Sequence, residues 1–267
     1  TRYETLFPYT TLFRSLAAAL AASKQHYPVV HIEAGMRSFN KEMPEELNRI
    51  MADHASTLLF APTNTAFKNL MAEGFRPENI APYDINNPRI FLTGDIMYDN
   101  SLFYADLAER KKQGFMQEMG LEENDYVLVT IHRDMNTDDP ERLEAIFSTL
   151  MELAASHRIS MIMPLHPRTI IALRNRRPEI YEDLTENEYI SIVRPVSFLE
   201  MILLERKAAM IITDSGGVQK ESHFFARPCI VLRKETEWVE LVKNGTVKLA
   251  DADPEKIRKA WDYFMNN

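Results

Sequence analysis

Residues 208–221 read Ala-Ala-Met-Ile-Ile-Thr-Asp-Ser-Gly-Gly-Val-Gln-Lys-Glu. The first six residues form an apolar, partly β-branched run, which is typical of a buried strand. Ser215 follows closely and can cap the helix that the next residues, 218–225, predict. A short buried strand, a tight turn and a helix in this order indicate an α/β fold.

The same alternation continues in both directions along the chain. Strands are predicted at residues 28–33, 57–61, 89–93, 126–131, 160–165, 189–193, 208–213 and 229–232. Helices are predicted at residues 16–25, 44–54, 63–74, 97–116, 140–155, 168–174, 197–206, 218–225 and 254–264. Near-continuous apolar strands separated by helices predict parallel sheets with helices on both faces. We therefore expect an α/β protein with two Rossmann-like domains.

The polar region 111–125, with Gly114 and Gly120, is the best predicted domain boundary. It divides the chain into a partial N-terminal domain, 16–118, and a C-terminal domain, 119–267. A ligand is expected in the cleft between them, at the carboxyl ends of the strands. Residues 1–15 (TRYETLFPYTTLFRS) show no clear helical or strand period, and we interpret them as a non-native segment.

Composition excludes several classes of function. Of the 267 residues, 31 are Lys or Arg and 39 are Asp or Glu, giving a net charge of −8. This balance argues against non-specific binding of nucleic acid, which needs a basic surface. The single Cys229 excludes an internal disulfide and favours an intracellular protein. No apolar run is long enough to span a bilayer, so the sequence predicts a cytoplasmic protein without a membrane partner.

The turn after residue 213 is the strongest indication of a phosphate site. Ser215 can cap the helix, while Gly216 and Gly217 let a ligand approach the backbone. Exposed N–H groups and the helix dipole then favour an anion such as a diphosphate. The alternative is an ordinary strand-to-helix turn, in which Ser-Gly-Gly is common.

A second group of residues lies in His31-Ile-Glu-Ala-Gly-Met-Arg37 and Met43-Pro-Glu-Glu-Leu-Asn-Arg49. Glu33 ends an apolar strand, where a carboxylate needs a partner or a function. Glu45 lies in the first turn of a helix begun by Pro44, and Arg49 lies four residues later on the same face. The structural alternative for this pair is favourable interaction with the helix dipole plus an i,i+4 ion pair.

Polar residues also follow other predicted strands. His132, Arg133 and Asn136 follow one strand, His166 follows the next along the chain, and Arg233 follows the strand at 229–232. A histidine can exchange protons near neutral pH, and an arginine can hold phosphate. Each could instead be structural, but several such strand ends favour a cleft lined for an anion. The chain has no His-x-x-x-His helix and no pair of cysteines, so we expect no metal site. It also has no G-x-G-x-x-G and no Walker sequence, so we expect no nicotinamide cofactor.

From about Leu16 to its end, the chain resembles the non-hydrolysing UDP-N-acetylglucosamine 2-epimerase family. The resemblance depends on six segments in the same order: His31-Ile-Glu-Ala-Gly-Met-Arg37, Pro44-Glu-Glu-Leu-Asn-Arg49, Phe60-Ala-Pro-Thr63, Thr93-Gly-Asp95, His132-Arg133 and Asp214-Ser-Gly-Gly-Val-Gln-Lys-Glu221. It implies a fold similar to GT-B glycosyltransferases, with UDP bound in the cleft. It further implies inversion at C2 of the sugar, without NAD or an essential metal, in a homodimer that serves cell-surface polysaccharide biosynthesis.

The resemblance also assigns roles by position. Glu33 and Glu45 match carboxylates implicated in proton transfer near C2, and Arg49 matches a supporting residue. His132 matches the histidine that stabilises departing UDP. The remaining substrate-binding candidates are Arg133, Asn136, His166, Ser215, Gly216, Gly217, Glu221 and Arg233, among which Ser215 and Gly216 match diphosphate binders and Glu221 matches the acceptor of ribose hydroxyls.

Three departures qualify the resemblance. The family's Gly-Thr-Arg-Pro-Glu-like phosphate loop and its Gly-Asp-Thr motif are absent, so we expect a truncated and inactive form of an active parent. Glu235-Thr-Glu-Trp-Val-Glu240 stands where many family members have Arg-Pro after the second Glu. The Trp-Val form is similar to relatives that act on UDP-2,3-diacetamido-2,3-dideoxyglucuronate. A GT-B glycosyltransferase and a non-catalytic nucleotide-sugar binding fragment remain alternatives.

Overall fold

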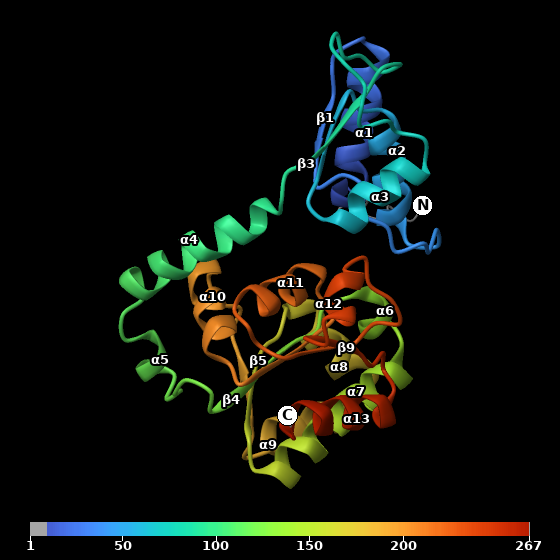
Figure 1. Ribbon diagram of the computed structural model, residues 1–267. Coiled ribbons are helices and arrows are strands. Elements are labelled where there is room, and N and C mark those ends of the chain that lie inside the picture. Colours follow the sequence, from blue (N-terminus) through green and yellow to red (C-terminus); the bar gives the residue numbers. More distant parts are fainter. Residues whose placement is uncertain (1–9, 267) are drawn as a thin grey trace. The chain divides into compact units, whose positions relative to one another are not determined.

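The computed structural model describes residues 10–266. The chain forms two compact units, one ending at Met97 and the other beginning at Tyr98, and each unit has its own parallel sheet (Figure 1). Most of the predicted non-native segment, residues 1–9, lies outside the described residues. Residues 10–15 belong to helix α1, Thr10–Lys24, so the expectation that residues 1–15 lack a helical pattern is wrong for this part.

The first unit contains a three-stranded parallel sheet in the order β1-β2-β3. Its elements after α1 are β1 (Val30–Ile32), α2 (Pro44–His54), β2 (Leu58–Ala61), α3 (Asn64–Ala72) and β3 (Arg89–Leu92). Helix α2 begins at Pro44, as predicted, because proline lacks the N–H that would have no partner there. Thr63 caps α3 by accepting a hydrogen bond from the Ala66 N–H at 3.1 Å.

The second unit is built on a six-stranded parallel sheet in the order β6-β5-β4-β7-β8-β9. Its strands are β4 (Tyr126–Thr130), β5 (Ser160–Pro164), β6 (Ile190–Val193), β7 (Met210–Thr213), β8 (Cys229–Val231) and β9 (Val247–Leu249). The strand order reverses between β4 and β7, which pair in register from Val127↔Met210 to Thr130↔Thr213. In open parallel sheets, ligands bind beyond the carboxyl ends of the strands at such a reversal.

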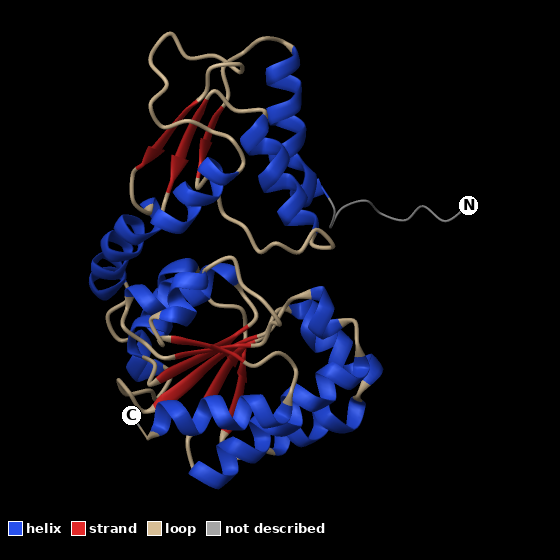
Figure 2. Cartoon of the chain, turned by 45° about the vertical axis from the view of Figure 1, so that its right-hand side comes forward, coloured by secondary structure: helices blue, strands red, loops and turns tan. Residues whose placement is uncertain are grey.

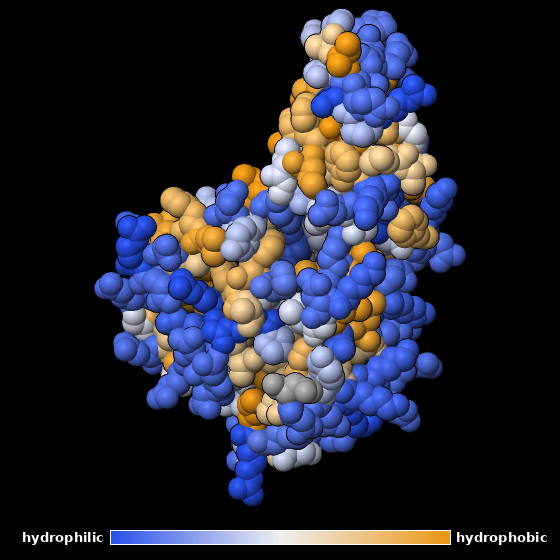
Figure 3. All heavy atoms as spheres, viewed as in Figure 1, coloured by the Kyte–Doolittle hydropathy of each residue, from blue (hydrophilic) through white to orange (hydrophobic). Residues whose placement is uncertain are grey.

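Helices cover both faces of this sheet (Figure 2). The helices of this part of the chain are α4 (Ile96–Lys111), α5 (Phe115–Glu118), α6 (Asp134–Thr137), α7 (Pro140–His157), α8 (Pro167–Arg176), α9 (Pro178–Glu186), α10 (Phe198–Lys207), α11 (Gly216–Phe224), α12 (Val239–Lys243) and α13 (Pro254–Met265). The large core includes Val127 and Val129 of β4, Phe147 of α7 and Trp261 of α13, all fully buried. The lower part of the face shown in Figure 3 is mostly hydrophilic, whereas hydrophobic residues, among them Leu102 and Phe103 of α4 and Phe198 of α10, remain exposed.

The predicted helix at 97–116 is two helices, α4 and α5, because Gly114 adopts a left-handed conformation with φ of 89° between them. Ala105 and Ala108 of α4 pack against Ile202 and Leu203 of α10. The structure therefore places α4 and α5 with the second unit, so the division at Met97 falls earlier than the predicted boundary after residue 118. Within residues 10–266, no helix has both the length and the hydrophobicity needed to cross a bilayer.

Candidate functional site

The loops after β4 and β7 meet at the buried carboxylate of Asp214. Its Oδ2 accepts hydrogen bonds from the Arg133 N–H at 2.9 Å and from Asn136 Nδ2 at 3.1 Å. Its Oδ1 lies 3.2 Å from His132 Nδ1 and also accepts from the His132 N–H. Burial alone would raise the pKa of Asp214, but the hydrogen bonds from His132, Arg133 and Asn136 outweigh it and hold that pKa below its ordinary value. Asp214 thus holds three predicted site residues, His132, Arg133 and Asn136, with its own charge.

Asn136 is fully buried, and its side chain connects the ends of neighbouring strands through hydrogen bonds. Its amide nitrogen also donates to the carbonyl of Leu232 at 3.1 Å, and its Oδ1 accepts from Arg142 Nη2 at 2.8 Å. These contacts give Asn136 a scaffolding role. Its predicted contact with substrate stays a prediction.

The first turn of α11 forms the centre of an anion-binding geometry. Ser215 caps the helix by accepting from the Val218 N–H at 3.4 Å. A Cβ built on Gly216 would lie 3.7 Å from Arg233 Nη1 and 3.8 Å from Arg133 Nη2, so both guanidinium groups approach this backbone. We call Gly216, Gly217, Arg133 and Arg233 the α11 anion site.

Arg233 provides the clearest indication of an anion at this site. Its side chain is 3% exposed, and its Nη2 donates to Glu237 Oε2 at 3.0 Å. Its Nη1, on the side of Gly216, is buried and has no hydrogen-bond partner among residues 10–266. A buried guanidinium nitrogen without an acceptor is costly. A phosphate oxygen at the helix N-terminus would supply that acceptor.

The other predicted residues of the second unit lie at neighbouring strand ends. His166 follows β5 and caps α8, where its Nδ1 accepts from the Arg168 N–H at 3.2 Å. Glu221 lies one turn into α11, and its Oε2 is 4.0 Å from the position of a Cβ on Gly217. Burial raises the pKa of Glu221, although the charge of Lys220 acts in the opposite direction.

In the first unit, Glu33 follows β1 in a backbone conformation that is rare for a residue with a side chain. Its φ is 70°, and its side chain is exposed. Gly35, two residues later, has a φ of 79°, and a Cβ there would lie 2.3 Å from the carbonyl oxygen of Ala66. Strained positions of this kind are found preferentially at functional sites.

A buried carboxylate, Asp53 of α2, holds the turn that carries Glu33. Asp53 Oδ2 accepts from the Gly35 N–H at 3.1 Å and lies 2.7 Å from Arg37 Nη2, while Oδ1 lies 2.6 Å from His31 Nδ1. Arg37 also contacts Glu73 at 2.6 Å. Burial alone would lower the pKa of Arg37, but the hydrogen bonds and charges of Glu73 and Asp53 raise it.

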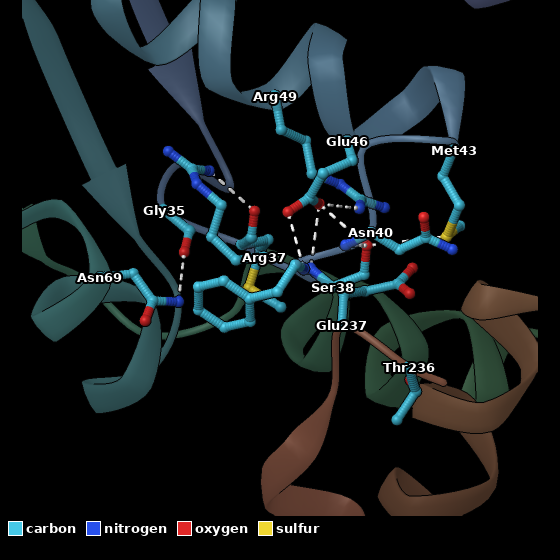
Figure 4. A network of polar contacts seen from close by, with 12 residues as sticks. Gly35, Arg37, Ser38, Asn40, Met43, Glu46, Arg49, Asn69, Thr236 and Glu237 are labelled. Atoms are coloured by element: carbon cyan, nitrogen blue, oxygen red, sulfur yellow. Dashed lines mark hydrogen bonds and ion pairs between the residues drawn. The ribbon is translucent and has the colours of Figure 1, made fainter. Parts of the chain in front are cut away.

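Glu46 of α2 binds the loop after this turn. Its carboxylate accepts from the N–H of Ser38 at 2.9 Å and from the N–H of Phe39 at 2.9 Å, and Arg49 Nη1 lies 3.2 Å away (Figure 4). Arg49 therefore forms an ion pair with Glu46, three residues back along α2. Glu45 is half-buried beside it in the first turn.

Glu46, Asp53 and Asp214 were missed as key residues by sequence reasoning. Glu46 and Asp214 stand inside the quoted motifs, and an acidic residue that ends an apolar strand, as Asp214 does, is a signal that could have identified it. Within residues 10–266, no group of three or more His, Cys, Asp or Glu side chains is placed to hold a metal ion.

Comparison with known proteins now adds to this geometry. The family model described as UDP-N-acetylglucosamine 2-epimerase matches residues 11–267. The chain belongs to this family. The match confirms the resemblance to this family that was stated from the sequence motifs.

Curated relatives are described with two different activities. A UDP-2,3-diacetamido-2,3-dideoxy-D-glucuronate 2-epimerase of Pseudomonas aeruginosa is 43% identical over 91% of this chain and 62% of its own length. A UDP-N-acetylglucosamine 2-epimerase of Methanocaldococcus jannaschii is 39% identical over 94% of this chain and 66% of its own length. The chain thus spans less than two thirds of the length of these relatives.

A solved structure confirms the predicted fold class. The crystal structure of the M. jannaschii UDP-GlcNAc 2-epimerase in complex with UDP-GlcNAc and UDP matches with a TM-score of 0.83 and 39% identity, covering 95% of this chain and 66% of that one. The protein therefore has the GT-B-like epimerase fold with two parallel sheets, in a form that is partial relative to its relatives.

Proposed function

We propose that this chain is the larger part of a non-hydrolysing UDP-N-acetylglucosamine 2-epimerase, which interconverts UDP-N-acetylglucosamine and UDP-N-acetylmannosamine. The observation that carries the proposal is the α11 anion site, where the unpartnered Arg233 Nη1 lies beside Gly216 at a helix N-terminus. The helix dipole, the backbone N–H groups and two guanidinium groups together suit a diphosphate.

The proposed reaction begins with removal of the proton from C2 of the sugar. The bond between C1 and the diphosphate oxygen breaks, its electron pair leaves with UDP, and C1 and C2 become joined by a double bond. UDP then adds back to C1 while a proton is delivered to the opposite face of C2. Both steps need a positioned base or acid near C2 and positive charge near the departing diphosphate.

The two sets of candidate residues suit these two needs. Glu33 and Glu45 are the proposed proton-transfer carboxylates, and Arg49 supports them. Asp214 fixes His132 through Nδ1 at 3.2 Å, an arrangement that leaves Nε2 as the nitrogen to interact with the departing phosphate.

The remaining proposed contacts involve the nucleotide. We assign Arg133, Ser215, Gly216, Gly217 and Arg233 to the diphosphate, and Glu221 to the ribose hydroxyls. His166 is assigned to the outer part of the same site, at the carboxyl end of β5.

UDP-2,3-diacetamido-2,3-dideoxyglucuronate is a second candidate substrate class. The P. aeruginosa relative that acts on this sugar is 43% identical to this chain, which is similar to the 39% identity of the M. jannaschii UDP-N-acetylglucosamine enzyme. Trp238 supports this alternative, because it stands where the resemblance leads us to expect Arg. The Trp238 ring is covered by the buried Lys220, whose Nζ lies 3.9 Å from the ring centroid.

The first experiment is a melting curve of this chain with UDP, with AMP as the control nucleotide. A ligand that binds the folded state raises the melting temperature. We expect a rise with UDP and none with AMP. A cooperative transition that does not respond to UDP would contradict the assignment of the α11 anion site.

A second experiment tests the reaction in a full-length parent. We expect turnover of UDP-N-acetylglucosamine, loss of epimerisation in Glu33→Gln, and nearly unchanged UDP binding in that variant. Exclusive turnover of the diacetamido glucuronate would replace our first substrate with the second. UDP binding without turnover of either sugar would favour a non-catalytic binding protein.

A further inference from the structure

Glu205 is a fully buried acidic residue to which the reaction above gives no role. It lies near the end of α10 and is 1% exposed. Its side chain is hydrogen-bonded to that of Glu221 on α11, the residue proposed to accept the ribose hydroxyls. Its Oε2 is buried, and no N–H or hydroxyl donor among the described residues reaches it.

This placement is costly for stability. A buried carboxyl group with an unsatisfied oxygen is disfavoured relative to an apolar side chain of similar size. Leu203 and Leu204, its neighbours in α10, are buried in the same unit, so apolar side chains are compatible with this part of the helix. The retention of an acid here therefore needs a reason beyond packing.

Two hydrogen-bonded carboxyl groups cannot both be ionised, so the pair must hold a proton. Burial, followed by the charge of Glu221 and the hydrogen bond to it, raises the pKa of Glu205 well above its ordinary value. Burial also raises the pKa of Glu221, but Lys220 and the hydrogen bond from Glu205 counteract that effect. Glu205 is fully buried whereas Glu221 is only partly buried, so the proton resides on Glu205, whose O–H donates to the Glu221 carboxylate.

Lys220 is the charged group whose effect opposes the negative charge of this pair. Burial raises the pKa of Cys229 to about 12 and raises that of Tyr126, so both are neutral at physiological pH. With the proton on Glu205, the pair carries one negative charge beside the α11 anion site instead of two.

The carboxylate of Glu221 is directed toward the start of α11. Its Oε2 lies 4.0 Å from the position of a Cβ on Gly217, four residues earlier on the same helix face. A donor that binds one lone pair of this carboxylate fixes the direction in which the remaining lone pairs can accept hydrogen bonds.

We propose that Glu205 is a positioning residue for nucleotide recognition: its carboxylic acid donates a hydrogen bond to Glu221 and fixes that carboxylate to accept ribose hydroxyls. The inference rests on the proposed binding of UDP. It assigns to α10 a role in selecting ribonucleotides, through a residue that does not itself touch the ligand.

The test measures dissociation constants by titration calorimetry for UDP, 2′-deoxy-UDP and 3′-deoxy-UDP. We expect the unaltered chain to prefer UDP over at least one deoxy form by about tenfold or more, because a hydroxyl bound to a charged acceptor is lost. Glu221→Gln, the reference variant, should lose most of this preference.

Two substitutions of Glu205 separate positioning from packing. Glu205→Gln keeps an N–H donor and should retain the preference within about threefold, whereas Glu205→Leu removes the donor and should reduce it to about two- to threefold. A Leu variant that discriminates like the unaltered chain would overturn the proposal. A Gln variant that loses as much as the Leu variant would overturn the hydrogen-bond role.

Two further measurements keep the outcome clear. If Glu205→Leu fails to fold, Glu205→Met takes its place with the same expected loss. Infrared difference spectroscopy of Glu205→Gln against the unaltered chain at neutral pH should show the loss of a protonated carboxyl band. The absence of this difference band would overturn the proposal. Failure of the unaltered chain to bind UDP would overturn the proposed function and this inference with it, whereas UDP binding with unchanged discrimination overturns the inference alone.

Discussion

A methyl group added at Gly216 should abolish much of the UDP affinity without unfolding the protein. The Cβ of Gly216→Ala would lie 2.9 Å from Glu237 Oε1, 3.7 Å from Arg233 Nη1 and 3.8 Å from Arg133 Nη2. It would thus occupy the space where an oxygen of the proposed diphosphate would meet both guanidinium groups. Glu237 must move slightly, but its contact is the end of a side chain rather than backbone.

The expected magnitude follows from the contacts that the methyl group displaces. Loss of one charge-assisted hydrogen bond corresponds to about 1.5–3 kcal/mol, or a dissociation constant about 10- to 150-fold weaker. Gly216 has an ordinary helical φ, so Ala can adopt its conformation. Because Ala is favoured over Gly in helices by about 0.5–1 kcal/mol, the free energy of unfolding should stay within about 1 kcal/mol of the unaltered value.

Gly217→Ala is a comparison within the same site, because it keeps the backbone N–H that Gly217 offers to the diphosphate and its methyl group would meet neither guanidinium group. A Cβ at Gly217 has neighbours no closer than 3.9 Å, which is ordinary van der Waals contact. We expect its affinity for UDP, measured by titration calorimetry, to change by less than about threefold, because no charge-assisted hydrogen bond is displaced. Equal affinities in the two variants, with both folded, would refute the location of the α11 anion site.

Three further predictions concern the stability of the two units. In urea unfolding, Gly35→Ala should lower the free energy of unfolding by more than about 3 kcal/mol, because its Cβ would lie 2.3 Å from the Ala66 carbonyl oxygen. Gly74→Ala is the control: Gly74 has a φ of 98° but no neighbour within 4 Å of its Cβ position, so the loss should be only about 1 kcal/mol. Equal losses in the two variants would contradict the steric argument. Asp53→Asn should destabilise the first unit by about 3–5 kcal/mol in the same assay, because it removes the negative charge that pairs with the buried guanidinium group of Arg37. A loss below about 1 kcal/mol would count against this role of Asp53. The folded state keeps a proton on Glu205 that the unfolded chain releases above about pH 4.3. The free energy of unfolding should therefore fall as the pH rises from about 4.3 toward the raised pKa of Glu205 in the folded state, and Glu205→Gln should flatten this slope. Identical slopes in the two proteins would be evidence against a protonated Glu205.

Much of the second unit was predictable because its strands are buried on both faces. Such strands leave continuous apolar runs, and β4 and β7 were both expected within a residue or two of their observed bounds. Helix α2 was predictable for a different reason, since Pro44 defines its start. The order in which the strands pair was not predicted, because it depends on contacts between distant parts of the chain.

Short elements were missed because they leave little periodic signal. Strand β9 has three residues and α12 has five, so neither contains enough apolar positions to define a period. Helix α9 could have been found, since Pro178 occupies its first position. The polar anchors were harder to predict. Asp53 contacts residues 18 and 22 positions away, and Asp214 contacts loops about 80 positions away, so their partners become evident only in the folded chain.

The attachment of two loops to Asp214 has a consequence for anyone who redesigns this protein. The loop after β4 and the start of α11 share one carboxylate, so they form a single preassembled part before any ligand arrives. Exchanging either loop alone for that of another nucleotide-sugar enzyme would leave the carboxylate without its donors or the donors without their carboxylate. Grafts should therefore move both loops with Asp214, and combined substitutions in the two loops should show strong epistasis instead of additive effects.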